Sequence, residues 1–192
     1  LLHGCSSLEG RTIFCSSPRK DLLPIYQRFG YSELETGALI LYPVPGFENP
    51  GAWLRFRSTT DPRKIAKILS EEDRAILEHH LPHPCRHLLI YNGAGYCHVV
   101  FSRTKGRRFH FANVHHISNL PLFLRALDLV RLRLALAAGA PFVMIEARLL
   151  PEDFSPRFSR RISFAATQVY KSETLKPSQI DGLYTETILL GL

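Results

Sequence analysis

The sequence predicts an α/β (α+β) fold in which helices cover both faces of a mixed, mostly antiparallel central sheet. Of the 192 residues, 45% are hydrophobic and 21% are charged, which is ordinary globular composition. Three strand-like runs follow one another with tight turns between them, which predicts an antiparallel meander. These runs are His87–Tyr91, Tyr96–Ser102 and Phe109–Ile117.

The charge and the cysteines limit the classes of partner and compartment. Twenty-four Lys and Arg residues against seventeen Asp and Glu residues leave a net charge of +7. This balance favours anionic partners such as phosphates, cofactor pyrophosphates, RNA or acidic lipid, but it concerns encounter and not chemistry. Cys5, Cys15, Cys85 and Cys97 form no CxxC pair. We therefore expect reduced, structural thiols and no metal site.

The apolar run over residues 120–140 is the candidate for a membrane span. It carries Arg125, Asp128, Arg131 and Arg133. Each charge near a bilayer centre would cost roughly 2.5–3.5 kcal/mol, so the run predicts a helix of a soluble protein. We expect a cytoplasmic protein with no membrane partner.

The N-terminal part reads as a strand, a helix and a hairpin. Thr12–Cys15 is β-prone, and Asp21–Phe29 places apolar residues at helical spacing. Tyr31–Leu34 and Ala38–Tyr42 are predicted to pair as a hairpin. The Pro- and Gly-rich stretch that follows excludes a helix or a central strand, and we place a linker over residues 47–52.

A second series of elements begins after this linker. Trp53–Arg57 is predicted as a strand, Asp61 with Pro62 as the start of a helix, and Ser70 as the cap of the next helix. Pro82 is predicted to end that helix, ahead of the meander.

The longest predicted helix begins at Asn119 and Pro121 and ends at Gly139, which suits a left-handed cap. Phe142–Ala147 is predicted as a buried strand and Pro151–Arg161 as irregular. Two closing strands follow at Thr167–Tyr170 and Tyr184–Leu190.

The predicted strand, the helix that ends in the stretch from Pro24 to Tyr31 and the hairpin after it together resemble the C-terminal half of a GNAT-superfamily acyltransferase. The family signature is Y-x-x-x-G-F, and Tyr26 and Gly30 match it, with Tyr31 in place of Phe. Residues 53–192 resemble a second GNAT-like unit in the order of their elements: strand, two helices, meander, long helix, strand and terminal pair. The resemblance implies a tandem protein, with residues 1–46 as a half unit, that transfers an acyl group from acetyl-CoA or another acyl-CoA to an amine.

The second unit departs from the family where the cofactor should bind. The family's Q/R-x-x-G-x-G/A turn bares amides at a helix N-terminus for the CoA pyrophosphate. Residues 115–121 contain no glycine, and Pro121 removes one donor. In the first half the corresponding turn would lie before residue 1. By resemblance, Ile117, Ser118 and Asn119 are the expected cofactor contacts, and Arg103 and Arg107 could reach a phosphate.

Two residues are candidates for catalysis. The resemblance makes Tyr26 the acid that protonates the leaving CoA thiolate, and the alternative is an aromatic ring that packs under the sheet. His115 and His116 end the third meander strand, and alternation predicts one on each side of the sheet. His116 is the expected general base.

Other histidines and the basic loops support weaker hypotheses. His79, His83 and His87 recur every four residues, but prolines interrupt the helix and no acidic ligand accompanies them, so no metal is expected. We expect a small-molecule or protein amine as substrate and no nucleic acid, with a monomer and a homo-oligomer as the alternatives for assembly. The alternative is a non-catalytic binding or dimerisation module that contacts RNA through basic loops. In either case residues 1–46 have too few strands to stand alone and should dock on the second unit or on another chain.

Overall fold

The computed structural model describes residues 13–16, 20–34, 37–44, 48–49, 51–106, 108–163, 168–174, 176, 180 and 183. The strands are β1 (Ile13–Ser16), β2 (Ser32–Leu34), β3 (Gly37–Leu41), β4 (Arg57–Thr59), β5 (Arg86–Asn92), β6 (Gly95–Lys105), β7 (His110–Ile117), β8 (Phe142–Glu146), β9 (Ser159–Ser163) and β10 (Gln168–Lys171). The α-helices are α2 (Leu23–Arg28), α3 (Ala52–Arg55), α4 (Pro62–Ala66), α5 (Glu71–His80), α6 (Leu120–Arg125) and α7 (Leu127–Ala138), and the 3-10 helices are η1 (Lys20–Leu22) and η2 (Ala147–Leu149).

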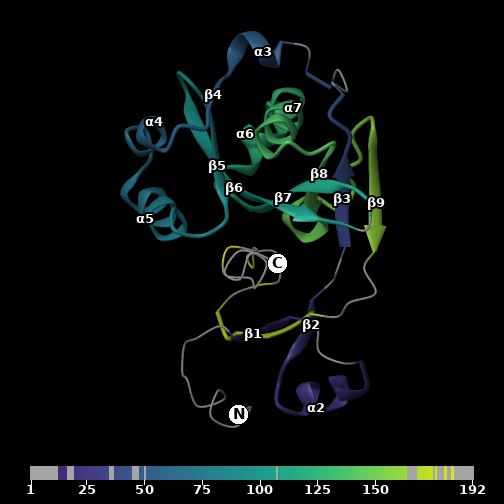
Figure 1. The fold of residues 1–192 in the computed structure, drawn as a ribbon. Helices are drawn as coiled ribbons and strands as arrows, with labels where there is room; N and C mark the ends of the chain where they lie inside the picture. The colour runs from purple at the N-terminus through teal and green to yellow at the C-terminus, as the bar shows by residue number, and fades with distance from the viewer. Residues whose placement is uncertain are drawn as a thin grey trace.

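The described strands form two sheets. The larger has the order β4-β5-β6-β7-β8-β3-β9, and the smaller has the order β1-β10-β2. All neighbours are antiparallel except β7 and β8, which are parallel. The smaller sheet lies below the larger one, beside α2 (Figure 1). The predicted fold class and the meander β5-β6-β7 are confirmed.

Helices cover both faces of the larger sheet. On one face, Leu88, Val99 and Val114 pack with the apolar sides of α3, α6 and α7 in the main core. On the other face, Leu89 of β5 packs with Ile65 of α4 and other side chains of α4 and α5. The alternation of side chains along β5 and β6 therefore separates the two layers.

The two sheets exchange strands. β2 pairs with β10 in the smaller sheet, whereas β3 enters the larger sheet between β8 and β9. In the same way β9 stays in the larger sheet and the next strand, β10, enters the smaller one between β1 and β2. The order β8-β3-β9 thus repeats the order β1-β10-β2.

This exchange shows that the predicted hairpin of β2 with β3 is wrong, although both strands exist. Every residue of Gly37–Leu41 is buried. A strand that is apolar at successive positions needs cover on both faces, and it takes a central position in the larger sheet. The N-terminal part docks on the rest of the chain through this strand.

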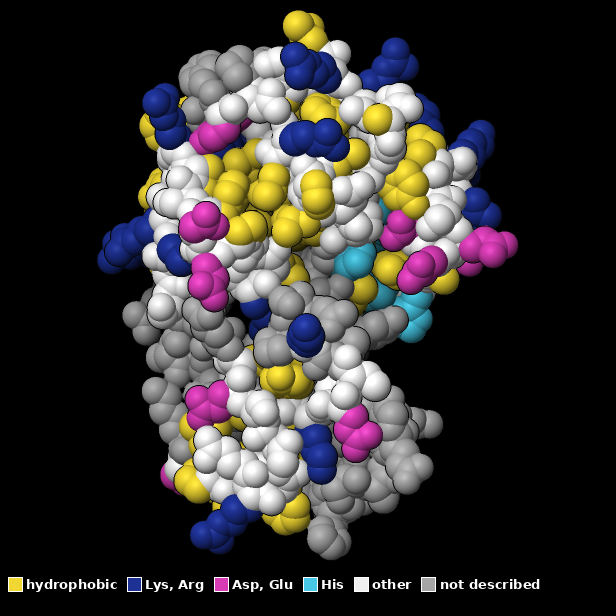
Figure 2. Space-filling view, turned by 180° about the vertical axis from the view of Figure 1, so that it is seen from behind, with side chains coloured by type: hydrophobic (Ala, Val, Ile, Leu, Met, Phe, Trp, Pro, Cys, Tyr) yellow, Lys and Arg dark blue, Asp and Glu magenta, His cyan; other side chains and the backbone are white. Residues whose placement is uncertain are grey.

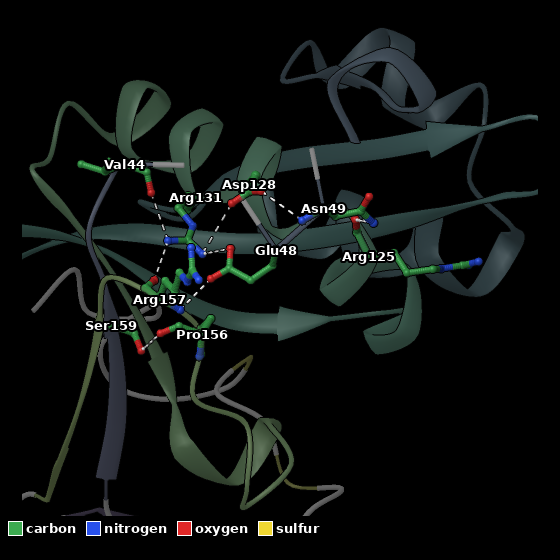
Figure 3. A network of polar contacts seen from close by, with 9 residues as sticks. All are labelled: Val44, Glu48, Asn49, Arg125, Asp128, Arg131, Pro156, Arg157 and Ser159. Carbon is green, nitrogen blue, oxygen red and sulfur yellow. Dashed lines mark hydrogen bonds and ion pairs between the residues drawn. The ribbon is translucent and has the colours of Figure 1, made fainter. Parts of the chain in front are cut away.

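A buried arginine fixes the segment that follows β3 (Figure 3). Arg131 of α7 is fully buried and donates to the carbonyls of Val44 and Arg157, each at 3.0 Å. Its other terminal nitrogen lies 3.1 Å from a Glu48 oxygen and 3.7 Å from an Asp128 oxygen. The Arg157 amide donates to the second Glu48 oxygen. One guanidinium therefore ties the chain after β3 and the chain before β9 to α7.

The second exchanged strand, β10, is held by hydrogen bonds at partly buried positions. The Lys171 ammonium group donates to the carbonyl of Phe29, at the end of α2, at 3.0 Å. Arg148 of η2 donates to the side chain of Gln168 and to the carbonyl of Ile180, each at 2.8 Å. These contacts link β10 to α2 on one side and to the larger sheet on the other.

Three other predictions need correction. Residues 52–55 form one turn of helix and the strand begins at Arg57, because a short run with three apolar residues does not distinguish a strand from a helical turn. Residues 159–163 form β9, because β3 supplies a partner that the local sequence does not reveal. The long helix is interrupted at Ala126, where the Arg125 carbonyl accepts the side-chain amide of Asn49 at 2.7 Å.

The predicted helix ends are confirmed. Asp61 accepts from the Arg63 amide, Ser70 from the Asp73 amide and Asn119 from the Leu122 amide. Gly139 adopts the left-handed conformation, at φ 60° and ψ 44°. The predicted strand Tyr184–Leu190 lies outside the described residues. Among those residues, no helix has both the length and the hydropathy to cross a membrane. The boundaries of the predicted units stay a prediction.

Candidate active site

The C-terminal end of β7 projects beyond its neighbour β8. The parallel pairing joins Phe111–Val114 to Phe142–Ile145 and stops there, so residues 115–117 have no β8 partner. On its other side, β7 is paired with β6, with Val114 opposite Phe101 and His116 opposite Val100. One extra residue, His115, therefore forms a bulge next to the point where β7 and β8 separate.

The bulge turns both histidines onto the same face of the sheet. The His115 Nε2 lies 2.8 Å from the Ser102 hydroxyl, and the His116 ring centroid lies 6.3 Å from that of His98. Ser102 and His98 are four residues apart on β6 and share one face. The prediction that His115 and His116 face opposite sides is wrong, because simple alternation fails at a bulge.

Three imidazole rings form a row on this face, across β7, β6 and β5. The rings of His116 and His98 meet edge to face, and the His98 Nε2 lies 3.0 Å from the His87 Nδ1. The His98 and His87 rings are stacked with centroids 5.2 Å apart. We call His87, His98 and His116 the imidazole row. His98 is fully buried and His87 is 4% exposed.

Burial keeps two rings of the row neutral. Desolvation, followed by the charge of His80, lowers the pKa of His87 to about 4. Desolvation, followed by the charges of His87, His116 and His80, lowers the pKa of His98 to about 3. Both rings are thus uncharged near pH 7. The bond between them then needs one ring to donate and the other to accept.

Cys85 and His80 border the row. The Cys85 sulfur lies 3.9 Å from the His87 Nε2, and its thiol donates to the His80 carbonyl at 3.0 Å. Burial raises the pKa of this thiol. The fully buried ring of His80 contacts the carbonyls of Ile76 and Leu183, at 2.8 and 2.9 Å. His80 therefore links Leu183 to α5.

A second polar group lies further along the same face. The hydroxyl of Ser102, which is almost completely buried, contacts both the His115 ring and the Thr104 hydroxyl. The side-chain oxygen of Asn113, opposite Ser102 on β7, is buried without a hydrogen-bond partner among the described residues. The face therefore offers acceptors and hydroxyl groups, but no carboxylate among the side chains of these contacts.

The turn from β7 to α6 uses its polar groups internally. The Ser118 amide donates to the His98 carbonyl, and the Ser118 hydroxyl accepts from the His98 amide. Asn119 caps α6, and Ile117 packs against the core on the opposite face. With Pro121 as the second residue of α6, few amides are free to point outward. The residues present do not fit a CoA pyrophosphate, although Ile117, Ser118 and Asn119 are where a GNAT-like unit would bind it.

Of the two predicted phosphate contacts, Arg103 does not lie at this turn. Arg103 is exposed on β6 opposite Ala112, whereas the turn lies opposite His98. Five residues of strand separate Arg103 from His98, or roughly 17 Å at ~3.3 Å per residue. Arg107 lies outside the described residues.

Tyr26 belongs to the other sheet. It lies in α2, and its ring meets the ring of the buried Tyr31 edge to face at 5.5 Å. The Tyr31 amide also donates to the Tyr26 carbonyl. Tyr26 itself is partly exposed. Because α2 flanks the smaller sheet and β7 lies in the larger, the structure does not combine Tyr26 and His116 in one site (Figure 1).

The imidazole row is not apparent from the sequence. His87 shares a four-residue spacing with His79 and His83, but His87 lies in β5, and no set of three ligand side chains suited to a metal occurs in the part of the chain that is described. The available signal was period-two spacing: His87 and Leu89 alternate with buried apolar residues on β5, as His98 does on β6.

No protein-family model matches the chain, and no curated protein matches it. Among solved structures, it is similar to a GCN5-related N-acetyltransferase from Kribbella flavida. The two are 13% identical with a TM-score of 0.46, over 86% of this chain and 68% of the other.

Proposed function

We propose that the chain is a tandem GNAT-type acyltransferase that transfers an acyl group from acyl-CoA to an amine. The support is that three strands recur in the same order in an N-terminal half and a C-terminal half of the chain. The elements β1-α2-β2-β3 of the N-terminal half match β8-η2-β9-β10 of the C-terminal half in order. In each half the first two strands lie in one sheet and the last strand lies in the other. Two units of one fold that share a chain produce this arrangement. The order of elements from β4 to β8 also follows the order that the resemblance implies.

The two halves differ in the element that carries chemistry, and this difference supports Tyr26 as the acid. In the N-terminal half, helix α2 with Tyr26 connects β1 and β2. In the C-terminal half, the connection between β8 and β9 has one 3-10 turn, η2, and no α-helix. In the transfer, the amine attacks the thioester carbonyl, and the Tyr26 hydroxyl donates its proton to the departing thiolate. The larger sheet then serves as a non-catalytic support.

The test of this assignment is steady-state acetyl transfer to a panel of primary amines. Tyr26→Phe should lower kcat on the order of 100-fold with little change in KM, because it removes a proton donor and no binding surface. Tyr42→Phe, at the partly exposed end of β3, is the matched control and should keep full activity. Unchanged turnover in Tyr26→Phe would exclude the acid role.

A second candidate is acyl transfer at the larger sheet with His116 as the general base. The bulge favours it, because it places His116 beside two neutral imidazoles where β7 leaves β8. The engaged amides of Ser118 and Leu122, and the missing amide hydrogen of Pro121, weigh against it. His116→Ala should cost on the order of 100-fold in kcat if this site acts, and less than about twofold if Tyr26 carries the reaction.

Absence of activity in both assays would favour the binding module. Thermal melting with acetyl-CoA separates the classes further. Binding at 100 times its Kd adds about 2.7 kcal/mol to the free energy of unfolding, which is a clear shift. No shift at millimolar acetyl-CoA would support a non-catalytic unit.

A further inference from the structure

An exposed apolar surface lies at the end of the larger sheet where β7 and β8 begin. It consists of Tyr42, Pro43, Phe109, Leu136, Phe142 and Phe158, and we call it the apolar end. The ring of Phe142 contacts the rings of Tyr42 and Phe109, at 5.3 and 5.4 Å. The Tyr42 amide donates to the Phe158 carbonyl. These contacts make the surface continuous across four strands and their loops.

Large side chains of this surface are exposed to water. Leu136 is 66% exposed, Phe158 is 53% exposed and Phe109 is 52% exposed. Together with Tyr42 and the neighbouring Val44, they expose on the order of 400–500 Å² of apolar area, since an aromatic side chain has about 150–250 Å². That is as large as the biggest patch of a typical monomer, which is often functional.

The apolar end includes a groove. Its volume is about 420 Å³, and it is lined by Pro43, Leu132, Leu136, Gly139 and Pro141, among others. Pro43 directly follows Tyr42 in the chain, and Pro141 directly precedes Phe142. The groove therefore continues the aromatic surface. A side chain such as Leu136 from a facing surface has the right chemistry to fill it.

The surface is also held in place. Arg131 donates to the carbonyls of Val44 and Arg157, the residues that flank Pro43 and Phe158 (Figure 3). This fixes the two loop segments of the apolar end before any partner arrives. A preorganised surface loses less conformational entropy on association.

The charges around the apolar end are mixed, which favours a second copy of the chain as its binding partner. Seen from behind, hydrophobic side chains gather over the region of α7, and both acidic (Asp, Glu) and basic (Lys, Arg) side chains border them (Figure 2). Arg133, exposed one turn before Leu136, supplies a positive charge beside the apolar end. A two-fold related copy presents the same mixed border, so acidic side chains of each copy can meet basic side chains of the other. An anionic membrane would repel the acidic side chains of this border.

We propose that the chain forms a two-fold symmetric homodimer through the apolar end, with Leu136 and the exposed rings of Phe109 and Phe158 at its centre. A standard interface buries about 800 Å² on each partner, and the apolar end supplies about half of this. The charged border would supply the remainder. The proposal is independent of the catalytic assignment.

The test is sedimentation velocity and light scattering of the whole chain from about 1 to about 200 µM, a range that covers the Kd of modest dimers. We expect a concentration-dependent mass that reaches twice 21.8 kDa. The variant Leu136→Glu with Phe109→Glu should raise the dimer Kd at least ~30-fold, as loss of central contacts does. Ile25→Glu, on exposed Ile25 of α2, is the matched control and should dimerise normally.

Far-UV circular dichroism of each variant establishes that it is folded. A monomer at all concentrations overturns the proposal and leaves the surface to a different partner. A dimer that survives the double substitution also overturns it, since the contact then lies elsewhere.

Discussion

The two exchanged strands occupy equivalent places in their sheets but are held in different ways. β3 is buried at all five residues, and the chain that follows it is tied to α7 by a buried guanidinium with two carbonyls and two carboxylates around it. In β10 only Val169 is fully buried, and its anchors are Lys171 and Gln168 in partly exposed positions. We therefore expect the larger sheet to depend on β3 more than the smaller sheet depends on β10.

The largest effect expected on this comparison is from Arg131→Met. The change leaves Asp128, which is 1% exposed, without its cation and releases the Val44 and Arg157 carbonyls. Removing one partner of a buried ion pair costs about 3–5 kcal/mol. Urea unfolding measures this loss. Arg133→Met, on the exposed side of the same helix, should change stability by less than ~0.5 kcal/mol.

Truncation of one core side chain in each strand compares them directly. Leu39→Ala in β3 should cost about 2–5 kcal/mol, through lost burial and a cavity. Val169→Ala in β10 removes less volume and should cost about 1–2 kcal/mol. Equal losses, measured by urea unfolding, would show that the two strands contribute alike and would contradict the asymmetry.

Acid should weaken the larger sheet through the imidazole row. The ordinary pKa of histidine is near 6.5, and folding lowers it to about 4 at His87 and about 3 at His98. Below pH ~6.5 the unfolded chain therefore binds more protons, so stability is full above that pH and declines as the pH falls toward 4 and then 3. The loss is on the order of a few kcal/mol.

The measurement is the urea midpoint at about pH 7.5, 6 and 5. His98→Leu should flatten the pH dependence, because it removes one of the two rings and the bond between them. The exposed His79→Gln is the control and should retain the slope of the unaltered chain.

The smallest effect concerns the anchor of β10. Lys171→Met removes one charge-assisted hydrogen bond to the Phe29 carbonyl at a partly exposed position. We expect a loss of about 0.5–1.5 kcal/mol in the same unfolding experiment. A loss that matches Arg131→Met would mean that the smaller sheet is as tightly closed as the larger one.

Local signals in the sequence predicted the elements well where a cap or a turn residue marked them. Asp61, Ser70 and Gly139 act as their positions predict, and the meander is bounded by recognisable turns. Pairing across long separations was less accessible. That β3 joins β8, about 100 residues later, follows from the need to bury an all-apolar strand on both faces, and no local residue encodes it.

The candidate site was predicted less completely than the fold. His116 is predicted from its position at a strand end, but the face it occupies depends on the bulge at His115, opposite Val100 and Phe101, which the sequence does not mark with a glycine. His87 and His98 were overlooked because each is one polar residue in an otherwise apolar strand. The two rings come into contact only because β5 and β6 are paired.

The position of β3 in the larger sheet limits how the chain can be divided into fragments. A fragment that starts at the predicted linker would keep β8 and β9 but lose β3, the strand between them. The backbone groups of β8 and β9 that pair with β3 would then lack hydrogen-bond partners. Neither half of the molecule is thus a natural unit for excision, duplication or fusion, even though each resembles one in outline. We therefore expect the two sheets to unfold together, as one cooperative unit.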